Sequence, residues 1–388
     1  MKIVIVEPLA HRAGHYTKEL YSYCRCLSPY VDKVDVLTPF GFKEEWRNID
    51  SCTVYKLLVD SKTGFARYET TSAPGYLVQW QFYKRATFDI KRLQPDIVHV
   101  WGYKSTFPLW RFLRCRKNNP KVIMTLKAVK RSHAPILRSK LLASLQENLS
   151  YYLLRNIADS YIVHTEEMAK QAKAIGIGEN EIAIIPTGID EHDPTITKEE
   201  ARRRLRLPPG VFLLLLFGVL REEKSVFEIL RLAKTLSDNI MLYIVGEDWT
   251  PGGVQSFIDK EGAQQNVICN LQYLPETEVE VHFRACDAVI IASRPEFAGE
   301  SGVLLQAAEY EIPILAAAHG HSGMLIRKEK IGMVFEYGNA ISFQAAVREL
   351  VNTLRRDPFF FKISMKHFKQ SRDWEHIISQ YLRLYDHP

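Results

Sequence analysis

Arg221 and Lys224 lie three residues apart in the segment 217–224, which follows an apolar run typical of a buried strand. Gly218 stands near the start of this segment, where the missing side chain lets a ligand approach the backbone. Two cations beside the start of a helix are suited to neutralise a diphosphate. Because two glutamates lie between them, a pair of solvated charges on an exposed turn is the alternative. The segment is therefore a candidate phosphate site.

The segment 296–303 has the composition of an anion-binding loop that precedes a helix. Its candidate contacts are Glu296, Gly299, Glu300, Ser301, Gly302 and Val303. The small residues would present backbone N–H groups to an anion, and the dipole of the following helix would add to the attraction. The acids would accept hydrogen bonds from hydroxyl groups beside that anion. An ordinary N-cap at Ser301 is the alternative, but a cap does not require two glycines and two acids within seven residues.

Two further glycines follow strand-like runs, namely Gly246 and, in the first turn of the chain, Gly14. For Gly246 taken alone, a turn without a ligand is the favoured interpretation. The first turn lacks the G-x-G-x-x-G pattern, which argues against an NAD-linked oxidoreductase. Gly14 and His15 remain candidates for contact with an acceptor or a phosphate.

Apolar strand-like runs alternate with helix-length segments twice along the chain. The strands expected in the first half are 2–7, 33–37, 53–58, 97–101, 122–125, 160–164 and 182–185. Those expected in the second half are 212–217, 241–245, 267–271, 288–292 and 314–317. Expected helices include 17–27, 142–156, 226–237, 276–285, 302–310 and 340–356. This alternation predicts an α/β protein with two facing doubly wound, Rossmann-like domains, each built on a parallel sheet.

The alternation lapses after Asp190, so we place the domain boundary there, with domains at 1–190 and 191–371. The last segment, 372–388, carries apolar side chains at helical spacing and predicts an amphipathic helix that packs on the first domain. In doubly wound folds, ligands bind outside the carboxyl ends of the strands. The candidate residues that follow strands are therefore expected at one edge of each sheet.

The composition is that of an ordinary globular protein. With 388 residues, 46% hydrophobic and 25% charged, the chain is not disordered, collagenous or a coiled coil. Its longest apolar run, 211–219, is too short for a hydrocarbon core about 30 Å thick. The first residues lack the pattern of a signal peptide, so we expect a cytoplasmic protein. The six scattered cysteines indicate structural thiols and no zinc site.

The net charge of +6 is unevenly distributed. Residues 1–190 hold 28 Lys and Arg against 18 Asp and Glu, and the remainder holds 23 against 27. The block 101–150 supplies the asymmetry, with 11 basic residues and one acid, interleaved with aromatic residues. A solvated basic face is one interpretation, and peripheral attachment to an anionic membrane is the other. No RNA- or DNA-binding signature accompanies the charge, so we expect no nucleic-acid partner.

Taken together, these segments resemble the retaining nucleotide-sugar glycosyltransferases of glycosyltransferase family 4, which have the two-domain GT-B fold. The motifs that carry the resemblance are Pro186–Asp190, Phe217–Lys224, Ile244–Glu247, Ala285–Asp287, Ser301–Ala308 with Pro313, and Trp374–Tyr381. The last of these resembles the terminal helix that crosses back to the first domain. The similarity runs through nearly the whole second half and more weakly through the first.

The resemblance implies transfer of a sugar from a UDP- or GDP-sugar to an acceptor hydroxyl, with retention and with no metal or other cofactor. Arg221 and Lys224 would bind the donor diphosphate, and the loop 300–303 would hold the sugar and phosphate. Tyr273 and Leu274 would lie beside the nucleobase. A glycan or lipid-linked precursor, in polysaccharide, glycolipid or surface-glycan synthesis, is the expected acceptor.

The chain departs from the family pattern at its acidic pair. Members usually carry two Glu eight residues apart, and counting back from Pro313 puts Ala298 and Gln306 at those positions. Glu300 and Glu309 could serve instead, although these are nine residues apart, one more than the usual spacing. We expect Gln306 to contact the ribose hydroxyls, because an amide both accepts and donates hydrogen bonds. We expect Glu300 to contact a sugar hydroxyl.

A second departure lies at Lys127, where many members place a His. Lys127, His15 and His99 are the candidates on the acceptor side. Because the acidic pair is missing, a non-catalytic homologue that only binds a sugar nucleotide is an alternative interpretation. A GT-B sugar-nucleotide epimerase is a further alternative, but it would need additional acid and base residues.

Overall fold

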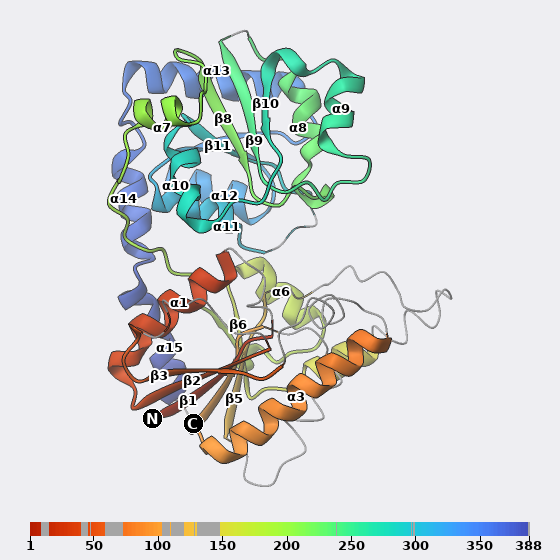
Figure 1. Ribbon diagram of the computed structural model, residues 1–388, viewed down its shortest axis with the longest axis vertical. Coiled ribbons are helices and arrows are strands. Elements are labelled where there is room, and N and C mark those ends of the chain that lie inside the picture. The colour runs from red at the N-terminus through yellow and green to blue at the C-terminus, as the bar shows by residue number, and fades with distance from the viewer. Residues whose placement is uncertain are drawn as a thin grey trace. The chain divides into compact units, whose positions relative to one another are not determined.

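The computed structural model describes residues 1–8, 15–39, 46, 48–58, 73–102, 109, 120–127, 129, 148–237, 239–295, 297 and 299–386. The chain forms two compact units (Figure 1). Unit 1 contains Met1–Gly188 together with Trp374–Pro388, and unit 2 contains Ile189–Asp373. The chain therefore passes between the units twice, at 188–189 and at 373–374. The sequence placed these passages at 190–191 and 371–372.

Unit 1 is built on a parallel sheet of seven strands in the order β3-β2-β1-β4-β5-β6-β7. Its strands are β1 Lys2–Val6, β2 Lys33–Thr38, β3 Cys52–Lys56, β4 Ile97–Val100, β5 Lys121–Thr125, β6 Ser160–Val163 and β7 Ile182–Ile184. The direction of winding reverses between β1 and β4. All seven strands expected from the sequence are present, with ends that differ by one or two residues.

Unit 2 is built on a parallel sheet of six strands in the order β10-β9-β8-β11-β12-β13. Its strands are β8 Phe212–Phe217, β9 Ile240–Val245, β10 Val267–Asn270, β11 Ala288–Ile291, β12 Ile314–Ala317 and β13 Gly332–Phe335. The winding reverses between β8 and β11, so ligands are expected near the carboxyl ends of these two strands. The edge strand β13 was not expected, because it begins with a glycine and is only partly buried.

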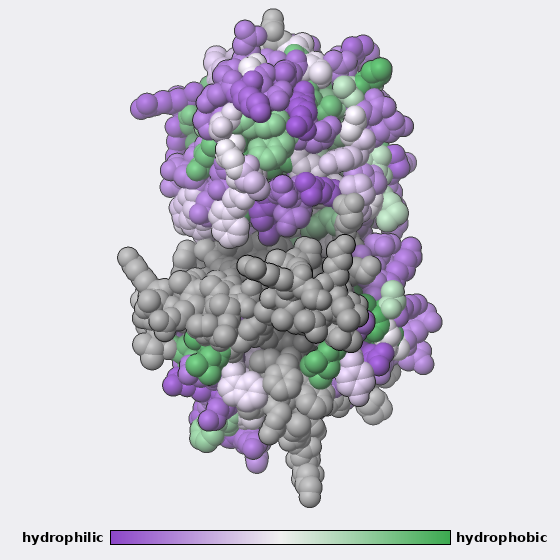
Figure 2. Space-filling view, turned by 90° about the vertical axis from the view of Figure 1, so that its right-hand side faces the viewer, coloured by the Kyte–Doolittle hydropathy of each residue, from purple (hydrophilic) through white to green (hydrophobic). Residues whose placement is uncertain are grey.

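Helices connect the strands in both units. Unit 1 contains α1 His15–Leu27, α3 Ala73–Leu93, α6 Glu166–Ala174, α15 Trp374–Asp386 and a helix over 148–154. Unit 2 contains α7 Lys198–Arg204, α8 Val226–Ala233, α9 Val254–Glu261, α10 Glu276–Arg284, α11 Gly302–Glu309, α12 Gly320–Glu329, α13 Ala340–Arg356 and α14 Lys362–Ser371. Residues 142–147 of the expected helix 142–156 lie outside the described residues. Figure 2 shows that hydrophilic residues predominate on one face of unit 2, with hydrophobic residues in small groups.

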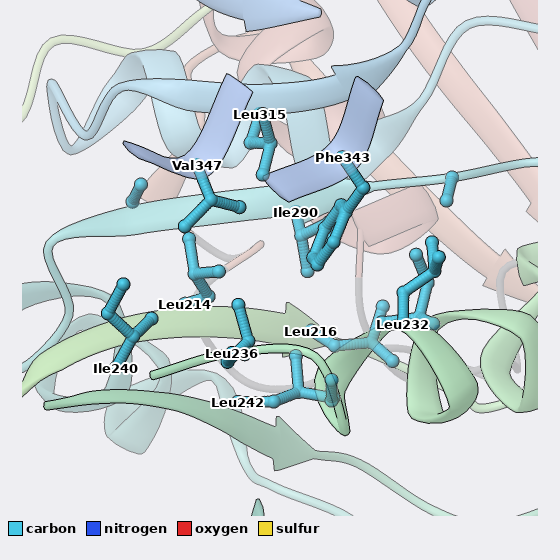
Figure 3. Packing of buried hydrophobic residues seen from close by; sticks show 14 of the residues in the cluster. Leu214, Leu216, Leu232, Leu236, Ile240, Leu242, Ile290, Leu315, Phe343 and Val347 are labelled. Atoms are coloured by element: carbon cyan, nitrogen blue, oxygen red, sulfur yellow. The ribbon is translucent and has the colours of Figure 1, made fainter. Parts of the chain in front are cut away.

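The continuous leucine run of β8 reflects burial on both faces of the sheet. Leu214 and Leu216 belong to a cluster with residues of α8 and α13, including Leu232 and Phe343 (Figure 3). The alternate residues of the strand belong to a second cluster on the opposite face. Successive strand side chains point to opposite faces, so a strand covered on both sides requires apolar residues at every position.

The predicted C-terminal amphipathic helix is α15, and it packs within unit 1. Its buried residues are Trp374, Ile377, Ile378, Tyr381 and Tyr385, and they share one cluster with residues of α1. Trp374 packs closely against the backbone where the chain first leaves unit 1. A Cβ added at Gly188 would lie 2.4 Å from Cδ2 of that ring. The last thirteen helical residues are therefore an integral part of the first unit.

Candidate functional site

Gly218 and Gly246 end the adjacent strands β8 and β9, and their backbones lie in close contact. A Cβ added at Gly246 would lie 2.2 Å from the carbonyl oxygen of Gly218, and both residues have positive φ. Neither position therefore accepts a side chain without strain. The sequence alone favoured a simple turn at Gly246. The structure shows that this glycine lets the backbone after β8 pass close to the end of β9.

Lys224 is held beside Gly218 at the end of β8. Its Nζ donates a hydrogen bond of 3.0 Å to the carbonyl oxygen of Phe217, and a Cβ at Gly218 would lie 2.8 Å from the same Nζ. The ammonium is thus turned back toward the strand end. The sequence-based alternative of a freely solvated Lys224 is wrong, because its side chain is only partly exposed.

The pKa of Lys224 is lowered to about 7, chiefly by burial and next by the positive charge of Arg221, against a smaller opposing effect of Glu223. Arg221 itself is exposed and precedes the short 3₁₀ turn Glu222–Lys224. The ammonium of Lys224 is poorly solvated, and the positive charge of Arg221 repels it. An anion placed between them would relieve both effects, so this pair is suited to bind a phosphate group.

The N-terminus of α11 lies next to the same strand end. A Cβ at Gly218 would come within 3.9 Å of Cγ2 of Val303, in the first turn of the helix. Ser301 occupies the N-cap position, but its side chain makes no capping hydrogen bond to any described residue. The first N–H groups of a helix have no partner within it. Those of Gly302 and Val303 are therefore donors that an anion can use, supported by the helix dipole.

Glu300 is buried and bound by a residue that no motif singled out. Arg372 forms an ion pair with its carboxylate through Nη1, and both side chains are less than 10% exposed. Nε2 of His321, in the first turn of α12, lies 3.8 Å from the same carboxylate oxygen. Glu300 is thus fixed between the loop after β11, the start of α12 and the segment that leads out of unit 2.

Gln306 and Glu309 lie on α11 and are buried, with exposed fractions of 6% and 5%. Gln306 is one turn beyond Val303, on the helix whose N-terminus faces Gly218. Glu309 lies at the other end of the helix, where its carboxylate is 3.9 Å from Nδ1 of His192. Because Glu309 is directed toward His192, the geometry favours Gln306 over Glu309 for a contact near the helix N-terminus.

The remaining donor candidates are only partly described. Tyr273 is half exposed just before α10, whereas Leu274 is buried at 9%. Gly299 packs against a ring, since a Cβ there would lie 3.2 Å from Cζ of Phe297. Gly14 and Glu296 lie outside the described residues, as does most of the basic block 101–150. Of His15, only the backbone at the start of α1 is described.

Lys127 follows β5 in unit 1 and is firmly bound. Its Nζ forms an ion pair with Glu19 of α1, lies 3.2 Å from Nε2 of His164 and sits over the ring of Trp101 at 4.8 Å. The sequence indicated a role for Lys127 but not these partners. They come from three other elements at the carboxyl edge of the sheet, which spacing along the chain does not reveal.

His99 is a core residue, which corrects its assignment as an acceptor contact. Its exposed fraction is 0%, Nε2 lies 2.8 Å from Thr125 Oγ1, and Nδ1 lies 2.6 Å from the hydroxyl of Tyr385. Burial, with smaller contributions from Lys127 and His164, lowers the pKa of His99 to about 3. The ring is therefore neutral and joins β4 to α15 within unit 1.

No cluster of three or more His, Cys, Asp or Glu side chains in the described part of the chain could hold a metal ion. None of the described helices is long and apolar enough to cross a membrane.

Two family models match successive parts of the chain. The model for glycosyltransferase family 4 matches residues 21–193, and the model for glycosyl transferases group 1 matches residues 197–357. Each match therefore falls largely in one structural unit. No curated protein matches the chain significantly in sequence.

Solved structures of similar fold cover nearly all of the chain. HepE from Anabaena, in complex with UDP-glucose, has 16% identity, a TM-score of 0.72 and 99% coverage of both chains. WaaG, a glycosyltransferase of lipopolysaccharide biosynthesis, has 15% identity, a TM-score of 0.70 and 100% coverage of both. The catalytic domain of Arabidopsis thaliana starch synthase IV, bound to ADP and acarbose, has 14% identity, a TM-score of 0.72 and coverage of 99% and 98%. The two family models together match most of the chain and show that it belongs to the glycosyltransferases of the family-4 type, and the similar structures show that its fold is GT-B.

Proposed function

We propose that the protein transfers a sugar from a nucleoside diphosphate sugar to an acceptor hydroxyl, with retention of configuration and without a metal ion. The observation that carries the proposal is the grouping of Gly218, Lys224 and Val303 at one edge of unit 2. The backbone of Gly218, the ammonium of Lys224 and the N-terminus of α11 lie close together there. These are the groups that bind a diphosphate. Retention is proposed from the family resemblance alone.

The leaving group explains why such a site suffices for catalysis. As the bond from the sugar C1 to the diphosphate oxygen breaks, negative charge grows on the diphosphate. Lys224, Arg221 and the N–H groups of Gly302 and Val303 would stabilise that charge, which is strongest in the transition state. The acceptor oxygen would form the new bond to C1, and its proton would pass to the departing diphosphate oxygen. Fixed cations and dipoles in this arrangement would replace a divalent ion.

The contacts to the rest of the donor follow from the positions on α11 and in the preceding loop. Gln306 would bind the ribose hydroxyls, and Glu300, fixed by Arg372, would accept a hydrogen bond from a sugar hydroxyl. Tyr273 would lie beside the nucleobase. A relative in fold binds UDP-glucose and another binds ADP, which supports a nucleotide-sugar donor without selecting the base.

For the acceptor, we propose a glycan or lipid-linked precursor presented at an anionic membrane surface. The basic and aromatic composition of residues 101–150 supports this choice. A role limited to binding a sugar nucleotide is the second candidate, and the absence of the usual acidic pair is the observation that favours it. Slow hydrolysis of the donor in the absence of an acceptor would distinguish an enzyme from such a binder.

The experiment that tests the donor class is a thermal-shift panel of UDP-glucose, UDP-galactose, GDP-mannose and ADP-glucose. A ligand at 100 times its dissociation constant stabilises the native state by about 2.7 kcal/mol. We expect one nucleotide to raise the melting temperature clearly and the matching nucleoside diphosphate to do the same. No shift with any member would contradict the proposed donor class. Once an acceptor is found, the anomeric configuration of the product, determined by NMR, tests retention.

A further inference from the structure

Three large apolar side chains are exposed where α13 ends and α14 begins, two in the intervening turn and one in the first turn of α14. Phe359, Phe360 and Ile363 have exposed fractions of 67%, 57% and 72%. Within the described residues, no other stretch of five contains three large hydrophobic residues that are this exposed. Such side chains on a surface mark an interaction site when they lie together and polar residues surround them. We call these three residues the apolar tip.

The backbone holds the apolar tip in a defined conformation. Phe361, between the exposed residues, is buried in the core of unit 2. The N–H of Phe359 donates to Oδ1 of Asp357 at 2.9 Å, and the N–H of Lys362 donates to the carbonyl oxygen of Phe359 at 2.8 Å. The hydrogen-bonded turn and the start of α14 therefore already direct the three side chains outward. Little further conformational entropy is lost when a partner binds.

Exposed basic residues flank the apolar tip along the chain. Arg355, Arg356, Lys362 and Lys366 are all exposed, and Asp357 is the one acid between residues 355 and 366. Its carboxylate accepts the backbone hydrogen bond just described. Lys362 stands in the first turn of α14, where no acid is present and where the helix dipole disfavours a cation. Nζ of Lys362 lies 5.2 Å from the centroid of the Phe359 ring, so this cation packs against the apolar tip itself.

The topology places this surface away from the donor edge of the sheet. The helix α13 follows β13, packs on it and must run back along the sheet. It therefore ends at the amino edge of the strands, while Gly218 and Lys224 lie at the carboxyl edge. The apolar tip can consequently be covered without blocking the diphosphate site of the same unit.

We propose that the apolar tip inserts into the interfacial region of a membrane that contains anionic lipids. Exposed Phe and Ile side chains between cations match a surface with an apolar interior and negative headgroups. A second copy of the chain fits less well. Symmetric pairing would bring like charges together, and a stable protein interface uses about 20–30 residues on each side rather than three.

Co-sedimentation of the full chain with vesicles tests this proposal. We expect binding to vesicles of phosphatidylcholine with about 30% phosphatidylglycerol, and at least about tenfold weaker binding to phosphatidylcholine alone. The triple variant Phe359→Ser, Phe360→Ser, Ile363→Ser should reduce binding about tenfold or more. The variant Lys362→Gln, Lys366→Gln should reduce binding and its salt dependence. The matched control is Phe88→Ser, at a 69% exposed residue of α3.

A second set of variants separates this surface from the basic block of the first half. If Arg114→Gln, Arg116→Gln, Lys117→Gln abolishes vesicle binding and the triple variant retains it, the proposal is overturned. Vesicle binding that is absent altogether, or self-association that depends on the apolar tip, also overturns it. The triple variant should keep the thermal shift given by the donor nucleotide. The melting temperature without ligand shows whether the variant is folded, so the vesicle test does not depend on the proposed catalytic function.

Discussion

At the scale of single residues, Lys224 has an unusual protonation equilibrium. Its pKa is lowered from 10.5 to about 7, so the native state binds fewer protons than the unfolded chain between these pH values. This group's contribution to stability therefore rises as the pH increases through that window. A diphosphate bound beside Lys224 would favour the charged form and raise the pKa again. Ligand binding and protonation are thus coupled at this residue.

This coupling predicts proton uptake when the donor binds. At pH 8 about nine-tenths of the free protein would hold a neutral Lys224, so nearly one proton should be taken up with each nucleotide sugar. Calorimetry in buffers of different ionisation enthalpy measures this number. A nucleotide sugar is the right probe because its diphosphate carries no group that titrates near neutrality. Uptake should vanish in Lys224→Met, and equal uptake in that variant would show that another group is responsible.

The ion pair of Glu300 and Arg372 predicts a separation of stability from activity. Arg372→Met leaves a buried carboxylate without its cation and should cost about 3–5 kcal/mol. The double variant Arg372→Met, Glu300→Gln removes that charge and should recover most of the stability, as measured by denaturant unfolding. Its transferase activity should stay low, because the sugar contact is lost. Recovery of both quantities would mean that Glu300 has only a structural role.

At the scale of elements, the close approach of the ends of β8 and β9 can be tested through its glycines. In Gly246→Ala, the added Cβ would lie only 2.2 Å from the carbonyl oxygen of Gly218. We expect it to cost more than about 2 kcal/mol and to weaken donor binding. Gly252→Ala is the matched control, because Gly252 also has positive φ but no atom lies within 4 Å of the added Cβ. Equal losses in the two variants would show that φ, not the contact, is responsible.

The sequence predicted most strands of both sheets because buried parallel strands are continuous apolar runs. It missed β13, which is a partly buried edge strand, and α12, whose first turn carries two glycines and obscures the helical periodicity. It also assigned no helix to α3, α6, α7, α9 or α14. The grouping of Gly218, Lys224 and Val303 was predictable because β8 and β11 are adjacent. The pairing of Glu300 with Arg372 was not, since 72 residues separate them and Arg372 lies in no motif.

At the scale of the whole molecule, the charge neutralisation built into unit 2 predicts activity without a divalent ion. Arg221, Lys224 and the N-terminus of α11 would supply the positive field that a metal provides elsewhere. Transfer should therefore persist in EDTA at a rate near that of the untreated protein. Loss of transfer in EDTA and its recovery with magnesium or manganese would contradict this part of the account.

The two units also carry separate surfaces, which makes the functions separable by experiment. The donor edge lies on unit 2, the Lys127 cluster on unit 1, and the apolar tip at the opposite edge of unit 2 from the donor residues. Variants of the apolar tip should change membrane binding with donor affinity unchanged, whereas variants of Arg221 should do the reverse. A shared effect on both would indicate coupling between the two edges.

The most direct test of the central claim is the release of nucleoside diphosphate from each nucleotide sugar of the panel, with and without acceptor extracts. We predict release from one donor by the wild-type chain, stimulated by acceptor. Arg221→Ala should reduce kcat/KM roughly 30- to 1,000-fold, which corresponds to a loss of about 2–4 kcal/mol of transition-state stabilisation. The matched control Arg231→Ala, an exposed residue of α8 in an i,i+3 pair with Glu228, should act like the wild type. Undiminished release by Arg221→Ala, or no release from any donor that binds, would contradict the account.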